Sequence, residues 1–158
     1  MGALVPLPSQ IEVIDTPGFW DSECRDPLFL QNLAEFLKGL SDGLNCVVVV
    51  FPATTIRFDQ NLKQMLELIG IIFGKEVWQH TRFVSTMWNS LHDEARAIAQ
   101  QKMLNEWPKM LKDELKVEDA NYSIINFEYD NPHSLDGLFD FVRDHPEPFV
   151  PEVTQKIS

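Results

Sequence analysis

The residues best suited to phosphate chemistry are Asp15-Thr16-Pro17-Gly18, which follow a short apolar run at positions 11–14. That run predicts a buried strand, which would hold Asp15 at its carboxyl end, where parallel sheets place ligands. A carboxylate there suits Mg²⁺, because this ion prefers oxygen ligands and keeps several waters. Gly18 lacks a side chain, so its N–H can approach an anionic oxygen closely. The segment predicts a binding site for a metal ion and a phosphate group, although Asp and Gly after a strand also occur in α/β proteins without such a site.

Composition narrows the class of protein. A chain of 158 residues can bury one substantial core. The net charge of −11 and the scattering of the 13 Lys and Arg residues predict no nucleic-acid partner. Cys24 and Cys46 lack CxxC spacing, which predicts reduced thiols in an intracellular, cytoplasmic protein. The amino-terminal residues do not form a signal peptide, and no apolar run is long enough for a membrane segment.

Strand-like and helical patterns alternate along the chain. Strands are predicted at 11–15, 44–51, 81–87 and 122–129, and helices at 28–40, 58–73, 91–115 and 135–142. This order predicts an α/β fold with a doubly wound, mostly parallel sheet and three α/β/α layers. The β-branched run at 44–51 predicts a central strand covered by helices on both faces. Pro108 is expected to kink or divide the third helix.

Polar clusters follow each predicted strand, at 15–18, 52–57, 86–89 and 128–131. Because the carboxyl ends of parallel strands meet at one edge, these four clusters are expected to line one crevice. Residues 1–10 are interpreted as an amino-terminal extension, residues 11–145 as the domain, and residues 146–158 as a Pro-rich, extended tail.

Together these motifs resemble the AIG/GIMAP family of immunity-associated GTPases, a septin-related branch of the P-loop GTPases. The segment Asp15-Thr16-Pro17-Gly18-Phe19-x-Asp21 is similar to the family's switch II motif. Residues 40–58 and the helix that ends at Phe73-Gly74 resemble the segment between the third and fourth GTPase motifs. Thr86-Met87-Trp88-Asn89 lies where the family has its base-reading Thr-Lys-x-Asp. The resemblance covers residues 11–145.

The resemblance implies binding of GTP or GDP with Mg²⁺, and homo- or hetero-oligomers with related GTPases. It implies that Asp15 holds Mg²⁺ through water and that Gly18 contacts the γ-phosphate, with Thr16 beside it. At the base, it implies contacts from Asn89 and, nearby, from Thr86, Trp88, Glu128 and Tyr129. Arg57 occupies the place of an arginine finger offered in trans, and the alternative is a surface Arg at a helix start. Phe19 replaces a water-orienting Gln, so hydrolysis is expected to be slow.

The phosphate loop of the family is missing from these residues. No Gly-x-x-x-x-Gly-Lys-[Ser/Thr] occurs, and the nearest run, Gly70 to Lys75, is interpreted as a helix C-cap. The fold is therefore expected to lack its first two strands, leaving two strand edges unpaired. One interpretation is a fragment of a longer GTPase that binds GTP weakly by itself. The alternative is a nucleotide-independent pseudo-GTPase that contacts related GTPases.

Asn89 departs from the family's pattern. The family's Asp accepts hydrogen bonds from the N1–H and N2–H₂ groups of guanine, whereas an Asn offers one acceptor and one donor group. Guanine selectivity is therefore expected to weaken. Met87 replaces the Lys that covers the base, and Trp88 could stack there instead. Equally, Trp88 and Asn89 could form a turn with Asn89 or Ser90 as the cap of the next helix.

The four histidines, His80, His92, His133 and His145, show no spacing typical of a metal site and no nucleophile partner. All four are interpreted as surface or capping residues.

Overall fold

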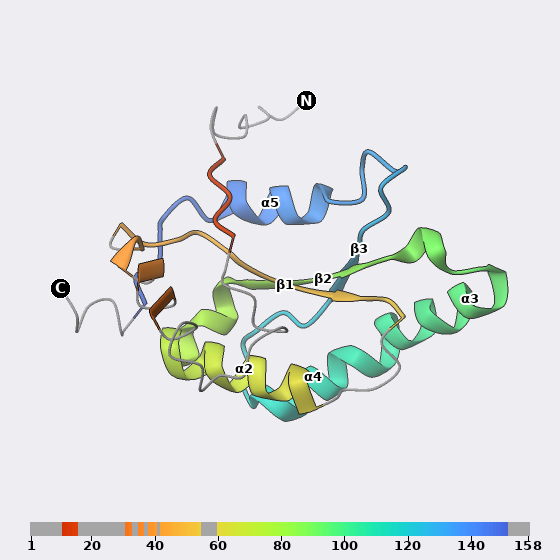
Figure 1. Ribbon diagram of the computed structural model, residues 1–158, viewed down its shortest axis with the longest axis horizontal. Helices are drawn as coiled ribbons and strands as arrows, with labels where there is room; N and C mark the ends of the chain where they lie inside the picture. The colour runs from red at the N-terminus through yellow and green to blue at the C-terminus, as the bar shows by residue number, and fades with distance from the viewer. Residues whose placement is uncertain are drawn as a thin grey trace.

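The computed structural model describes residues 11–15, 31–32, 35–36, 38–40, 42–54 and 60–151 (Figure 1). Its sheet contains β1 (Val47–Pro52), β2 (Thr81–Thr86) and β3 (Ile124–Asn126), in the order β1-β2-β3. Both pairings are parallel, with Phe83 of β2 opposite Val49 on one side and Ile124 on the other. The expectation of a parallel α/β fold is therefore confirmed for the described residues.

Among the elements that the structure describes from end to end, four α-helices flank this sheet. They are α2 (Gln60–Phe73), α3 (Asp93–Gln101), α4 (Trp107–Leu115) and α5 (Asp136–Asp144), and short 3-10 helices span Lys75–His80 and Trp88–Ser90. Figure 1 shows α5 on one side of the sheet and α2 and α4 on the other. Helix α2 ends where predicted, because Gly74 has a φ of 86° and its N–H donates to the carbonyl of Gly70 at 3.0 Å.

The predicted third helix is divided near Pro108. A π-helical turn, Lys102–Glu106, lies between α3 and α4, and Pro108 sits in the first turn of α4. Proline has no N–H to donate and its ring clashes with the carbonyl four residues earlier, so a regular α-helix is disfavoured there. A wider turn is one way in which a helix accommodates that disruption.

The main core lies between the sheet and the α2–α4 layer. Phe51 of β1 stacks on Trp107 of α4 with ring centroids 4.8 Å apart, and both side chains are buried. Leu62 and Leu66 of α2 are buried in the same cluster. The helix spacing of the apolar residues in α2 thus matches the face that it buries.

The predicted first strand is absent from the structure. Residues 11–15 are described, they form no strand, and all five are exposed, with Val13 86% exposed. Strand β1 is correspondingly at the edge of the described sheet rather than at its centre, and Val48 and Val50 are 39% and 46% exposed. The expectation that 44–51 forms a central strand is therefore wrong for the described sheet, whereas the edge position of β1 agrees with the expectation that a strand edge is left unpaired.

The remaining predicted strands and helices differ from the observed ones only in where they begin and end. Leu44 lies outside β1 and forms an isolated antiparallel bridge with Phe149. Strand β3 is shorter than the predicted 122–129. Of the predicted helix 28–40, the described positions 31–32, 35–36 and 38 are helical.

Gly43 makes the Leu44 bridge possible. Its φ is +84°, and a Cβ there would lie 2.8 Å from the carbonyl oxygen of Phe149. We expect Gly43→Ala to lower the free energy of unfolding by about 1–3 kcal/mol, because alanine is strained at positive φ. Urea denaturation measures this change. The matched control is Gly137→Ala in α5, where an added Cβ meets only the Ile125 side chain at 3.9 Å. Equal losses in the two variants would contradict the prediction.

Candidate functional site

Two of the four predicted polar clusters meet where β2 and β3 end. The N–H of Phe127 donates to the carbonyl of Ser85 at 2.8 Å, which extends the β2–β3 pairing to its last residues. On the other side, the N–H of Ala53 donates to the carbonyl of Thr86 at 2.7 Å. The loops after all three strands therefore begin at the same edge, where ligands of parallel sheets bind.

The chain turns sharply after Thr86. Met87 has a left-handed backbone conformation, with a φ of 66°, and its side chain is exposed. The hydroxyl of Ser90 donates to the Met87 carbonyl at 2.7 Å and steadies the following 3-10 turn. A left-handed conformation is unusual for a residue other than Gly or Asn, so the surrounding contacts hold it in place.

Trp88 is a core residue. Its side chain is fully buried, and its indole N–H donates to the hydroxyl of Ser85 at 2.8 Å. The Ser85 hydroxyl in turn donates to Oδ1 of Asn126 at 2.9 Å. The expectation that Trp88 stacks on a base is therefore not met in this conformation, because the ring presents no surface to solvent. The alternative of a turn at Trp88–Asn89 agrees with the 3-10 helix, but the cap position of α3 is His92 rather than Asn89 or Ser90.

Asn89 connects the two loops. It is exposed, and its side-chain Oδ1 accepts a hydrogen bond from the backbone N–H of Tyr129 at 3.3 Å. Because a backbone N–H can only donate, this contact fixes which end of the amide faces Tyr129. The two hydrogens on Nδ2 and the second lone pair of Oδ1 are then the groups that Asn89 can offer to a ligand.

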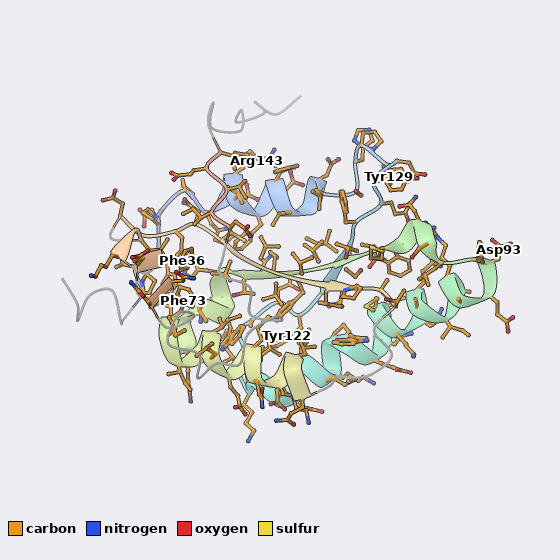
Figure 2. The ribbon with its side chains drawn as sticks, in the orientation of Figure 1. Phe36, Phe73, Asp93, Tyr122, Tyr129 and Arg143 are labelled. Atoms are coloured by element: carbon orange, nitrogen blue, oxygen red, sulfur yellow. The ribbon has the colours of Figure 1, made fainter. Side chains whose placement is uncertain are left out.

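Tyr129 lies beside Asn89 and is 78% exposed. Figure 2 shows Tyr129 on the loop after β3, at the same end of the molecule as Asp93 at the start of α3. An exposed aromatic ring next to amide donors suits a flat, polar ring such as a nucleobase.

Contacts within the protein fix both the side chain and the backbone of Glu128. Its carboxylate forms an ion pair with Arg96 of α3, and the same guanidinium donates to the carbonyl of Trp88 at 3.2 Å. The hydroxyl of Ser134 donates to the backbone carbonyl of Glu128 at 3.2 Å. Arg96 was not predicted as a site residue, because it belongs to no motif and lies 32 residues from its partner.

Residues 11–15 lie apart from this edge of the sheet. In Figure 1 they are on the side of the molecule where α5 ends, whereas the loop after β3 leads into the start of that helix. The predicted site residues Thr16, Gly18 and Arg57 lie outside the described residues. The described parts of the chain contain no cluster of three His, Cys, Asp or Glu side chains that could hold a metal ion.

Comparison with known proteins identifies the family. The sequence profile of the AIG1 family matches residues 5–138. This chain belongs to the AIG1 family. The match includes the Asp15 segment, the Thr86–Asn89 turn and the loop after β3, so the family resemblance is confirmed over most of the chain.

Two relatives of this chain come from Arabidopsis thaliana. The chain is 33% identical to immune-associated nucleotide-binding protein 4 over 75 residues, which are 48% of this chain and 23% of that protein. It is 32% identical to immune-associated nucleotide-binding protein 3 over 75 residues, which are 48% of this chain and 22% of that relative. The aligned part thus spans less than a quarter of either relative.

None of the helices in the described residues is both long and apolar enough to cross a bilayer.

Proposed function

We propose that this AIG1-family chain provides the base-reading part of a guanine-nucleotide-binding domain. The observation that carries the proposal is the contact between Asn89 and Tyr129, which joins the loops after β2 and β3. Asn89 would contact the base edge and Tyr129 would cover the ring. Thr86 would support the turn, and Glu128 would fix the second loop through Arg96.

The phosphate side of the proposal rests on the switch II resemblance. Asp15 would hold Mg²⁺ through water, Thr16 and Gly18 would lie at the γ-phosphate, and Arg57 would be offered to a second G domain. Among the described residues Asp15 is exposed and no group of three His, Cys, Asp or Glu side chains could enclose the ion, so phosphate oxygens and water would supply the rest of its ligands. With no Gly-x-x-x-x-Gly-Lys-[Ser/Thr] among the 158 residues, we expect this chain alone to bind GTP more weakly than micromolar.

An NMR titration of the chain with Mg²⁺-GDP and Mg²⁺-GTP tests both parts. We expect shifts in the side-chain amide of Asn89 and the backbone amide of Tyr129 at high ligand concentration. Asn121 provides a control signal, because its exposed side chain precedes β3 and bonds to the N–H of Ser123. Unchanged Asn89 and Tyr129 signals would exclude the base site, and a micromolar affinity by calorimetry would exclude weak binding.

A second function, a nucleotide-independent module that contacts related GTPases, is favoured by one observation. The polar groups of Asn89 and Glu128 already have partners within the chain, in Tyr129 and Arg96. Because these polar groups already have partners within the protein, this edge of the sheet does not need a ligand to remain ordered. A sharp thermal transition that nucleotide does not move, together with a monodisperse species in light scattering, would support this module. Aggregation without nucleotide would count against it.

A further inference from the structure

The carboxyl-terminal residues 145–151, here called the strap, close over the start of β1. Leu44 and Phe149 exchange two backbone hydrogen bonds, each 2.8 Å long. The side-chain Nδ2 of Asn45 donates to the carbonyls of His145 and Pro146, at 3.2 and 3.0 Å. The side chains of Phe149 and Pro151 are buried. The strap is therefore docked through both backbone bonds and apolar contacts.

His80 is half-buried and stacks on a ring of the strap, so the expectation of a surface residue holds only in part. It ends the 3-10 helix Lys75–His80, and its ring stacks on Phe149 with centroids 4.9 Å apart and planes 10° apart. Its Nδ1 atom is buried and has no hydrogen-bond partner among the described residues. In a neutral imidazole Nδ1 can carry a lone pair and no hydrogen, so it has no N–H that needs an acceptor. An imidazolium has an N–H there, and a buried N–H without an acceptor is destabilising.

Burial opposes the protonation of His80. Burial, above all, lowers the pKa of His80; among its charged neighbours the carboxylate of Glu76 raises this pKa, whereas His145 and Arg82 lower it. Arg82 lies 3.6 Å from the centroid of Phe141, on which the ring of His145 also stacks. Burial raises the pKa of the nearby Cys46 thiol to about 11, so Cys46 supplies no negative charge at neutral or acid pH.

We propose that the strap is an acid-released clasp, in which protonation of His80 separates Phe149 from the imidazole ring and opens the bridge between Leu44 and Phe149. This device is independent of the nucleotide site, because the strap packs at the start of β1 and the base-side loops follow the ends of β2 and β3.

The direction of the pH effect follows from proton linkage. In the open form His80 meets water and has the ordinary pKa of 6.5, whereas in the closed form the pKa lies lower. The open form therefore binds more protons below pH 6.5. Above pH 6.5 the closed form has its full stability relative to the open form. This stability decreases as the pH falls from 6.5 through the lower pKa that His80 has in the closed form. Each unit of difference between the two pKa values increases the opening constant by about tenfold.

Amide hydrogen exchange of the 158-residue chain tests the clasp. The probes are the N–H groups of Leu44 and Phe149, compared at pH 7.5 and 5.5 after correction for the intrinsic exchange rate. We expect their opening constants to rise several-fold at pH 5.5, while the amides of β2 keep their protection. His80→Phe keeps a ring against Phe149 but does not titrate, so it should abolish the acid response. His92→Asn is the matched control, because His92 is exposed at the start of α3, and should respond like the wild type.

An unchanged opening constant in the wild type, or a full acid response in His80→Phe, would overturn the proposal. If His80→Phe does not fold, the wild-type chain still decides the question by NMR. The signals of Phe149 must then follow the same titration midpoint as the imidazole of His80. Different midpoints would overturn the clasp.

Discussion

Replacement of Trp88 by alanine is expected to lower the free energy of unfolding by about 3–5 kcal/mol. The side chain is fully buried, so its loss leaves a large cavity beneath the turn that carries Asn89. The hydrogen bond from its indole N–H to Ser85 is lost as well. Urea denaturation followed by circular dichroism measures the change. A Trp88 that stacked on a base would instead leave stability unchanged and reduce nucleotide binding.

Two further variants separate packing from hydrogen bonding at this position. Trp88→Phe keeps an aromatic ring but removes the indole N–H, and we expect a smaller loss of about 1–3 kcal/mol. Tyr129→Ala is the surface control, because Tyr129 is mostly exposed, and should change stability by less than about 0.5 kcal/mol. A loss below about 1 kcal/mol in Trp88→Ala would contradict the assignment of Trp88 to the core.

Features that depend on neighbouring residues in the chain were predictable from the sequence. The apolar spacing in α2, its end at Gly74 and the division of the long helix near Pro108 all follow from local stereochemistry. The parallel sheet was also predictable, because strands that alternate with helices require crossovers.

Contacts between particular residues far apart in the chain were not predictable. Residues 11–15 have the composition of a strand, but a strand also needs a neighbour whose backbone groups it can meet. The sequence around Trp88 is compatible with either a surface ring or a core ring, and burial decides between them. Arg96 and His80 acquire their roles from Glu128 and Phe149, which no local spacing connects to them.

Asn89→Asp is expected to raise the preference for GMP over IMP by roughly tenfold to a hundredfold, if the proposed base site is correct. The two bases differ in one group, since guanine has an amine at C2 and hypoxanthine has a hydrogen. Oδ1 of Asn89 accepts the Tyr129 N–H and has one lone pair left for the N1–H of the base, so the Nδ2 hydrogens would meet the guanine amine donor to donor. An Asp can keep the Tyr129 contact with one oxygen and accept from the amine with the other. Such a bond to a carboxylate contributes about 1.5–3 kcal/mol.

The measurement is a pair of NMR titrations, GMP and IMP, for each variant. Asn121→Asp is the matched control, because it adds the same charge before β3 and leaves Asn89 intact. Repulsion of phosphate by a chain of net charge −11 affects both nucleotides equally and cancels in their ratio. A ratio that rises in Asn89→Asp alone supports direct contact with the C2 group. Binding with an unchanged ratio would mean that Asn89 does not read this edge, and no binding of either nucleotide would reject the base site itself.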